Sequence, residues 1–184
     1  MSIKISNNSF SNQFSRNYFP VKSMYGFNLL ELLISLAVLA ILASIAAPNF
    51  SDTVLGSKLT GYANSLVASS YLARSEAIKR NTVVNLCASS NGTSCASSGG
   101  WEQGWIILSG STVIKYQQAA GAGIKITELN NINILNFKPT GVGTTQATLT
   151  VCRSTPYVGK QERVVNISAT GRASVVRTTN GVCI

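Results

Sequence analysis

The stretch Gly26-Phe27-Asn28-Leu29-Leu30-Glu31-Leu32-Leu33-Ile34-Ser35 opens an apolar run that continues to Ala47. From Phe27 to Ala47, Glu31 is the only ionisable side chain. The run matches the roughly 20 residues that a helix needs to cross a bilayer core. A carboxylate inside such a run is costly in lipid, so Glu31 is a candidate functional residue. An ordinary membrane anchor that tolerates a glutamate near the interface is the alternative interpretation.

The residues from Gly26 to Leu32 resemble the class III signal of type IV prepilins and pseudopilins. The pattern combines a cleavage glycine, a glutamate at a fixed distance and a long apolar tail. Asn28 and Leu30 replace the usual Thr and Ile but keep the register of Gly26, Phe27 and Glu31. The resemblance implies that prepilin peptidase cuts between Gly26 and Phe27 at the inner membrane, and that the new N-terminal Phe27 is then methylated.

The chemistry of the cleaved chain agrees with that resemblance. Cleavage after Gly26 creates a positive α-amino group at Phe27, about one helical turn from Glu31. When helices bundle, this amine can pair with the Glu31 carboxylate of a neighbouring subunit, which offsets the cost of a charge in apolar surroundings and fixes the axial register. The resemblance therefore assigns Glu31 to assembly with other major or minor pilins.

The length and periodicity of the chain predict an α+β fold of the type IV pilin kind, with a long N-terminal helix packed on antiparallel β-structure. We expect a leader at 1–26, an assembly and transmembrane helix at 27–47, an amphipathic helix at 48–81 that Pro48 bends or loosens, and a β-rich periplasmic domain at 82–184. The predicted strands are 82–87, 103–108, 112–116, 124–127, 132–138, 147–153, 163–168 and 173–177.

The four cysteines, Cys87, Cys95, Cys152 and Cys183, all follow the apolar run. In a periplasmic domain disulfides are the expected state, and four cysteines allow three connectivities. We favour Cys87–Cys95, which closes a short loop, and Cys152–Cys183, which ties the end of the chain to a strand. A zinc site is the alternative, but the sequence has no CxxC pair and no histidine, so we expect neither a metal nor a cofactor.

A second resemblance is narrower than the pilin level. The segment from Tyr71 to Asn81, Val83 to Cys87, Gly104-Trp105-Ile106-Ile107 and Thr170-Gly171-Arg172 are together similar to the GspH/FimT group of minor pilins and pseudopilins. Within it, we expect Tyr71, Ala73, Ala77, Ile78 and Trp105 to lie in the core. Arg74 and Glu76 are either solvated or pair with neighbouring subunits.

Some FimT-type members bind DNA through a basic C-terminal Gly-Arg-x-Arg motif. The matching residues here are Gly171-Arg172-Ala173-Ser174, where Ser174 replaces the second arginine. The region from Val151 to Ile184 is nevertheless basic, and lysine and arginine contacts to phosphate supply most nonspecific DNA affinity. We therefore predict a weak, sequence-independent DNA patch, with a solvated positive face as the alternative. Its residues are Lys160, Arg163, Arg172 and Arg177.

An enzyme is not expected. The formal net charge is +9, there are only six acidic residues, and no histidine exists for a catalytic triad. The functional prediction is a minor type IV pilin that primes or caps the pilus, with possible DNA capture for natural transformation. A minor pseudopilin of a type II secretion system is the alternative. The expected location is the bacterial inner membrane, with the head in the periplasm, and then the pilus fibre.

Overall fold

The computed structural model describes residues 26–141, 145–154, 161–179 and 183. The predicted leader and Lys160 lie outside these ranges, apart from Gly26. The chain divides into two compact units, Met1–Ser44 and Ile45–Ile184. We call the second unit the head and describe each unit by itself.

The first helix, α1 (Leu29–Arg80), contributes its residues 29–44 to the first unit and its residues 45–80 to the head. Asn28 caps its N-terminus, because the Asn28 side-chain oxygen accepts a hydrogen bond from the Leu30 N–H at 3.4 Å. Its C-terminus lies where the sequence predicted it: Asn81 has a φ of 53°, and the Thr82 N–H donates to the Ala77 carbonyl at 3.3 Å. An asparagine at this left-handed position therefore ends the helix.

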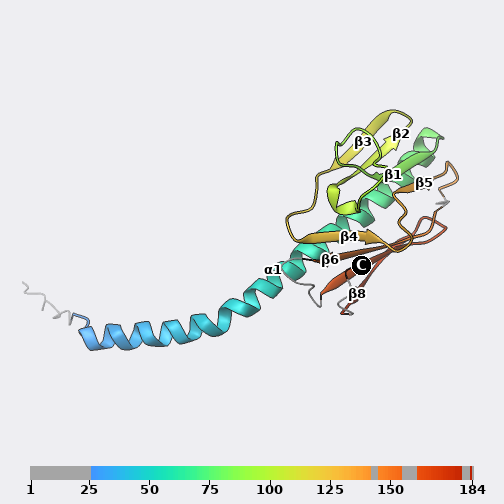
Figure 1. Ribbon diagram of the computed structural model, residues 1–184. Coiled ribbons are helices and arrows are strands. Elements are labelled where there is room, and N and C mark those ends of the chain that lie inside the picture. Colours follow the sequence, from blue (N-terminus) through green and yellow to red (C-terminus); the bar gives the residue numbers. More distant parts are fainter. Residues whose placement is uncertain (1–25, 142–144, 155–160, 180–182, 184) are drawn as a thin grey trace, which may run out of the picture. The chain divides into compact units, whose positions relative to one another are not determined.

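In the described part of the chain eight strands follow the helix, and a 3₁₀ turn, η1 (Trp101–Gln103), separates the first two. Their bounds are β1 (Val84–Ala88), β2 (Trp105–Ser109), β3 (Thr112–Gln117), β4 (Ile124–Glu128), β5 (Ile134–Phe137), β6 (Ala147–Arg153), β7 (Glu162–Ile167) and β8 (Ala173–Thr178). They form two four-stranded antiparallel sheets, ordered β3-β2-β1-β5 and β4-β6-β7-β8 (Figure 1). The α+β prediction is thereby confirmed, and the division into two sheets is an addition to it.

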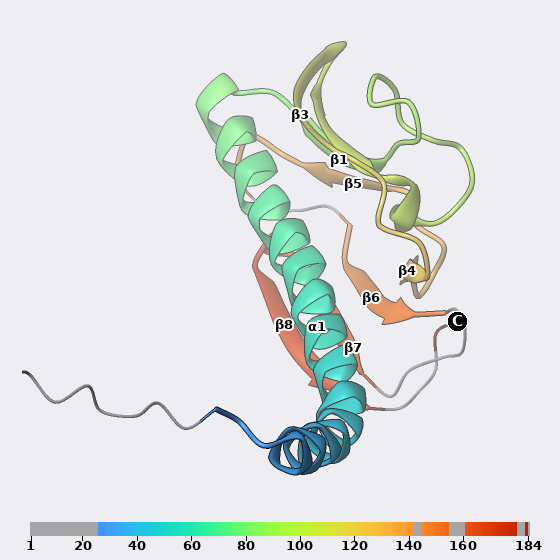
Figure 2. The same cartoon turned by 90° about the vertical axis from the view of Figure 1, so that its left-hand side faces the viewer.

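The core of the head lies where both sheets face α1 (Figure 2). The helix residues that it buries recur at steps of three, four and seven along one stripe, as an amphipathic helix requires. They are Leu55, Leu59, Ala63, Leu66, Ala73 and Ala77. The sheets add inward side chains at alternate positions, such as Leu149 and Val151 on β6, while Thr148 and Thr150 face the other way.

Two of the five residues that we expected in the core are largely exposed. Ala73, Ala77 and Trp105 are buried as predicted, but Tyr71 is 43% exposed and Ile78 is 53% exposed. The Tyr71 ring lies at the margin of the packed stripe, where its hydroxyl donates a hydrogen bond to the Ala173 carbonyl at 3.0 Å. The prediction for these two residues was wrong because the buried stripe of α1 is narrower than the run of apolar residues.

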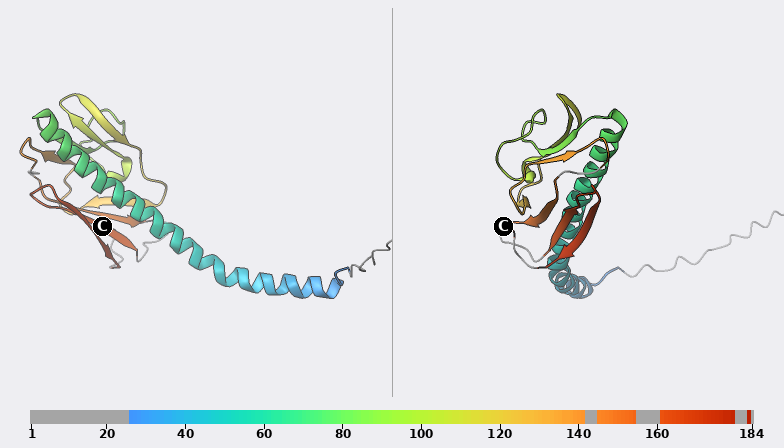
Figure 3. Two further views of the ribbon diagram at one scale, coloured as in Figure 1. Left: turned by 180° about the vertical axis from the view of Figure 1, so that it is seen from behind. Right: turned by 90° about the vertical axis from the view of Figure 1, so that its right-hand side faces the viewer.

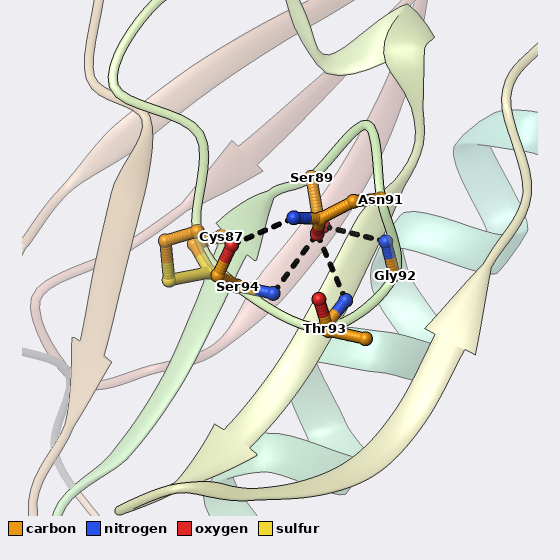
Figure 4. The surroundings of a disulfide bond; sticks show 7 residues. Cys87, Ser89, Asn91, Gly92, Thr93 and Ser94 are labelled. Carbon is orange, nitrogen blue, oxygen red and sulfur yellow. Dashed lines mark hydrogen bonds between the residues drawn. A yellow bond between two sulfur atoms is a disulfide. The ribbon is translucent and has the colours of Figure 1, made fainter.

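Both favoured disulfides are present, Cys87–Cys95 and Cys152–Cys183. The first closes a loop that the Asn91 side chain organises, because its oxygen accepts hydrogen bonds from the backbone N–H groups of Thr93 and Ser94 at 2.9 and 3.0 Å (Figure 4). The Ser89 hydroxyl oxygen accepts from the Gly92 N–H at 3.0 Å. This loop therefore owes its shape to local polar bonds as well as to the disulfide.

A search of the described residues for a helix with an apolar window long enough to cross a membrane finds none. The transmembrane role of 27–47 stays a prediction from the sequence.

Candidate functional site

The first candidate site is the segment that contains Gly26, Phe27 and Glu31. Gly26 to Asn28 precede the helix and are exposed, so the Gly26–Phe27 peptide bond lies in an accessible stretch. Glu31 lies in the first turn of α1, where a negative charge is favoured by the helix dipole. Within the described part of the chain no hydrogen bond or ion pair engages its exposed carboxylate.

Residues 29–44 of α1 are apolar on every side. Their large side chains are all more than half exposed in the single chain: Leu29, Leu30, Leu32, Leu33, Ile34, Leu36, Val38, Leu39, Ile41 and Leu42. A helix that is hydrophobic all round is normally buried in a large assembly or a membrane. This segment and its unpaired carboxylate therefore need a partner that the chain itself does not supply.

The second candidate site is the basic region of the head. Arg163 on β7 and Arg177 on β8 are direct cross-strand neighbours in the register of the β7–β8 hairpin. Their positions place them on the face of the sheet that is packed against α1, since Val165 and Ile167 share the parity of Arg163 and are buried. Figure 3 shows this hairpin beside the head part of the helix. The structure thus brings together two of the four residues of the predicted patch.

The Arg163 side chain spans the space between sheet and helix. Its Nε donates to the Thr60 hydroxyl at 3.1 Å, and its Nη1 donates to the Glu162 carbonyl at 2.9 Å. Burial lowers the pKa of Arg163 below its ordinary value, and the nearby charge of Arg177 lowers it further. The two guanidinium groups thus repel each other, and among the described residues of the cleft no carboxylate lies between them.

Arg163 and Arg177 line a cleft of about 780 Å³ between α1 and the β7–β8 hairpin. We call it the arginine cleft. Its other lining residues are uncharged: Thr53, Gly56, Ser57, Thr60, Gly61, Asn64 and Gln161. A Cβ added at Gly56 on this wall would come within 2.6 Å of the Gln161 side-chain oxygen, so the end of the Gln161 side chain would have to shift. The cleft therefore presents two positive charges in neutral, polar surroundings.

Arg172 lies elsewhere. It precedes β8 by one residue and lines a separate polar cavity of about 540 Å³ together with Thr148, Asn166 and Ser174. Thr148, Asn166 and Ser174 are cross-strand neighbours on the outward face of the sheet, opposite to the face that carries Arg177. The structure does not join Arg172 to the Arg163–Arg177 pair, and Lys160 is outside the described residues. Sequence spacing alone gave no sign of this separation.

The glutamate side chains of the head are engaged internally. Glu76 pairs with Arg80 and Lys79 at 2.6 and 3.6 Å, and the hydrogen bond from Arg80 is the main reason that the pKa of Glu76 lies below its ordinary value. Glu128 is buried and accepts hydrogen bonds from the backbone N–H groups of Asn130, Ile132 and Thr148. Sequence analysis missed this role of Glu128, because its partners come from two different segments.

Arg74, in the Tyr71–Asn81 segment, and Ser69, just before it, also have partners within the head. The Arg74 Nε donates to the Gly141 carbonyl, and the Trp105 indole N–H donates to the Ser69 hydroxyl at 3.0 Å. No group of three or more potential metal ligands occurs among the residues that the structure describes. This segment is therefore part of the structure of the head.

Known proteins resemble this chain in sequence and in fold. Residues 62–171, more than half of the chain, match the family model of the type II transport protein GspH. The minor pilin FimU of the Pseudomonas aeruginosa type IV pilus has a similar fold, with a TM-score of 0.52, 23% sequence identity and coverage of 65% of this chain and 89% of that chain.

A second crystal form of FimU gives a TM-score of 0.49 at 23% identity, covering 64% of this chain and 92% of that chain. The minor pseudopilin EpsH of the Vibrio cholerae type 2 secretion system gives 0.47 at 13% identity, covering 65% and 96%. No curated protein sequence matches the chain significantly.

Proposed function

This chain belongs to the GspH family, which holds minor pilins and pseudopilins, and from that premise we propose that it is a minor subunit that primes or caps a type IV pilus. The observation that carries the proposal is the unpaired Glu31 carboxylate in a helix segment that is apolar all round. Such a segment is unstable in water, so it is stored as a membrane anchor and then transferred to the interior of a filament.

The proposed mechanism has two steps. A peptidase first cuts between Gly26 and Phe27, which lie outside the helix and are exposed. The new α-amino group of Phe27 then pairs with the Glu31 carboxylate of a neighbouring subunit. In surroundings of low dielectric constant an unpaired charge is strongly disfavoured, so this pair sets which axial positions are allowed.

The assembly step is tested with Glu31→Ala, and Ser35→Ala serves as a matched control one turn later. Both residues are exposed on α1. Incorporation is measured as the amount of subunit in sheared filaments, relative to the amount in the membrane fraction. Glu31→Ala should reduce incorporation at least tenfold while Ser35→Ala leaves it unchanged. Equal incorporation of both variants contradicts the proposed role of Glu31.

The cleavage step is tested with Gly26→Ala. An added Cβ at Gly26 meets no described atom within 4 Å, so the substitution does not disturb the structure itself. The variant should keep its leader and run as the larger precursor on a denaturing gel. Normal processing of the variant removes Gly26 from the cleavage site.

The alternative to a type IV pilus is the filament of a type II secretion system. A pseudopilin of a type II secretion system uses the same assembly chemistry, and the surplus of basic residues after Val151 is the feature that favours a pilus. A deletion strain distinguishes the two readings: we expect pili and twitching to be lost while secretion of type II substrates continues. Loss of secretion with normal pili supports the pseudopilin instead.

DNA capture is the second candidate function, and the arginine cleft is the observation that favours it. Electrophoretic mobility shifts of a DNA duplex across a salt series test it, since phosphate contacts weaken steeply with salt. Arg163→Ala combined with Arg177→Ala should weaken binding, and Arg172→Ala reports separately on the outward face. Absence of binding even at low salt excludes DNA capture by this chain.

A further inference from the structure

The strand β8 forms one edge of its sheet and has an open side. Within the described residues it pairs with β7 and with no other strand. Natural edge strands are usually short or protected by charges, prolines or covering segments. Here Val175 and Val176 are 38% and 49% exposed, and Arg177 is the only charge in the strand. No described strand therefore covers the open edge of β8.

The register shows which backbone groups face the open side. The Ser168 N–H donates to the Arg172 carbonyl at 3.0 Å, so this pair is hydrogen-bonded across the hairpin. In an antiparallel ladder such pairs alternate with pairs that do not exchange hydrogen bonds, whose N–H and C=O groups point away from each other. Ala173, Val175 and Arg177 are in the second class, and the Ala173 carbonyl is taken by Tyr71. Val175 and Arg177 thus direct their N–H and C=O groups to the open side.

The side chains at the same place lack a negative charge. Arg177 is opposite Arg163 in a pair without mutual hydrogen bonds, the type in which Cα atoms approach to about 4.5 Å. Like charges at such positions are destabilising. Among the described side chains no acidic residue lines the arginine cleft, and the glutamates of the head each have partners within the head. An anion supplied by another molecule would therefore compensate the two charges.

We propose that an extended, acidic segment of another filament subunit adds to β8 as an outer strand and places a carboxylate in the arginine cleft. This inference rests on the proposed function of the chain as a filament subunit. Side chains alternate along the added strand, so its residue opposite Arg177 shares the cleft side and is acidic. The residues opposite Val175 and Val176 are apolar. The resulting motif is one acidic residue adjacent to two apolar ones.

Charge and chemistry exclude the other occupants. A second copy of this head is a poor partner, because the chain is basic and the described glutamates of the head are already paired. A nucleic acid could supply phosphate to the arginines, but it has no peptide groups to match the backbone donors and acceptors of Val175 and Arg177. An acidic peptide strand uses both features at once.

The test measures binding of labelled eight-residue peptides to the full chain in neutral detergent micelles by fluorescence anisotropy. The probes carry Glu-Val-Val or Val-Val-Glu in a threonine background, so that either strand direction is sampled. Lys-Val-Val and Val-Val-Lys are their matched controls. We expect the better glutamate probe to bind at least tenfold more tightly than its lysine control. Equal binding of glutamate and lysine probes overturns the proposal.

Two further arms test pairing along the backbone. A probe that is N-methylated at alternate residues cannot complete the ladder and should bind roughly tenfold more weakly. Val175→Pro removes an N–H that faces the open side, a place where edge strands tolerate proline, and should weaken binding similarly. Val175→Thr is its matched control and should bind like the wild type. Unchanged binding of the N-methylated probe overturns the proposal without needing any variant.

The last experiment reverses the charge at position 177. Arg177→Glu should bind the lysine probe more tightly than the glutamate probe, which a loss of folding could not produce. If a twelve-base-pair DNA duplex binds and the glutamate probes do not, the cleft serves nucleic acid and the proposal fails. These results do not depend on filament incorporation, so failure of the Glu31→Ala test and failure of strand addition remain distinguishable.

Discussion

The two parts of α1 present opposite surfaces to their surroundings. Residues 29–44 expose large apolar side chains on all sides and carry one unpaired carboxylate, Glu31. Residues 45–80 bury a stripe against two sheets and leave polar residues outside. The difference teaches that one continuous helix carries two kinds of surface. A surface that is apolar all round is normally buried in a membrane or a large assembly, whereas the stripe of residues 45–80 is buried by the head itself.

Loss of a core side chain of the head should have the largest effect on its free energy of unfolding, and loss of a side chain from residues 29–44 should have almost none. Trp105→Ala removes a buried indole and leaves the Ser69 hydroxyl without its hydrogen bond, so the free energy of unfolding of the head should fall by about 3–5 kcal/mol. Leu36→Ala, in the exposed part of α1, should change it by less than about 0.5 kcal/mol.

Urea unfolding of the full chain in neutral detergent, followed by near-ultraviolet circular dichroism, measures both values. Comparable losses of unfolding free energy for Trp105→Ala and Leu36→Ala would show that the head depends on residues 29–44 for its stability. That result would contradict the proposed difference between the two parts of α1.

The next effect comes from the disulfides, both of which lie in the head. Cys152–Cys183 closes a longer loop than Cys87–Cys95, with sequence separations of 31 and 8 residues. In the chain-entropy account the longer loop contributes more, about 3.7 kcal/mol against about 2.5 kcal/mol. Replacing each pair by serines should therefore destabilise the head in that order, as measured by urea unfolding. The opposite order would indicate that the hydrogen bonds around Asn91 depend on Cys87–Cys95.

Replacing glycines in the head part of α1 should have a smaller effect on the stability of the head. Gly61 has open space where a Cβ would lie, so Gly61→Ala should stabilise the head by about 0.5–1 kcal/mol. Gly56→Ala is the matched control. Its Cβ would meet the Gln161 side chain at the arginine cleft, so it should stabilise less. Thermal unfolding midpoints of the two variants provide the measurement, and an equal gain at Gly56 would show that the cleft wall is loose.

Much of this fold could be predicted from the sequence because its signals are local. The change of apolar period near Thr82, the asparagine at the helix end and the turn residues between strands all act over a few residues. Each of the eight predicted strands therefore overlaps an observed one. The disulfide pairing was also predicted correctly, since loop length and the position of Cys183 favour it.

The candidate sites were less predictable because they depend on register and on contacts between distant segments. The sequence placed Arg163, Arg172 and Arg177 in one basic region, but strand alternation directs Arg172 and Arg177 to opposite faces of the sheet. The contact between Thr60 and Arg163 joins residues 103 positions apart. No local pattern encodes which helix turn meets which strand, so the arginine cleft could not be anticipated.

The smallest expected effect is at the C-terminal turn of α1, and it contrasts Glu76 with Glu31. Arg80, followed by Lys79, lowers the pKa of Glu76 below its ordinary value of 4.5. A carboxyl whose pKa is lower in the folded state stabilises that state above its unfolded pKa, and this contribution is lost as the pH falls through the folded pKa. The head of Glu76→Gln should therefore lose less stability on acidification below pH 4.5 than the wild type.

The effect is modest because the pair is exposed and water screens it. Arg80→Met should produce nearly the same change, since it removes the main cause of the shift, whereas Lys79→Met should produce less. Urea unfolding at a series of pH values between 3 and 7 compares the three variants, and added salt should reduce the difference. If Lys79→Met matters more than Arg80→Met, the hydrogen bond from Arg80 is not the dominant interaction, and the end of α1 is held by general charge attraction instead.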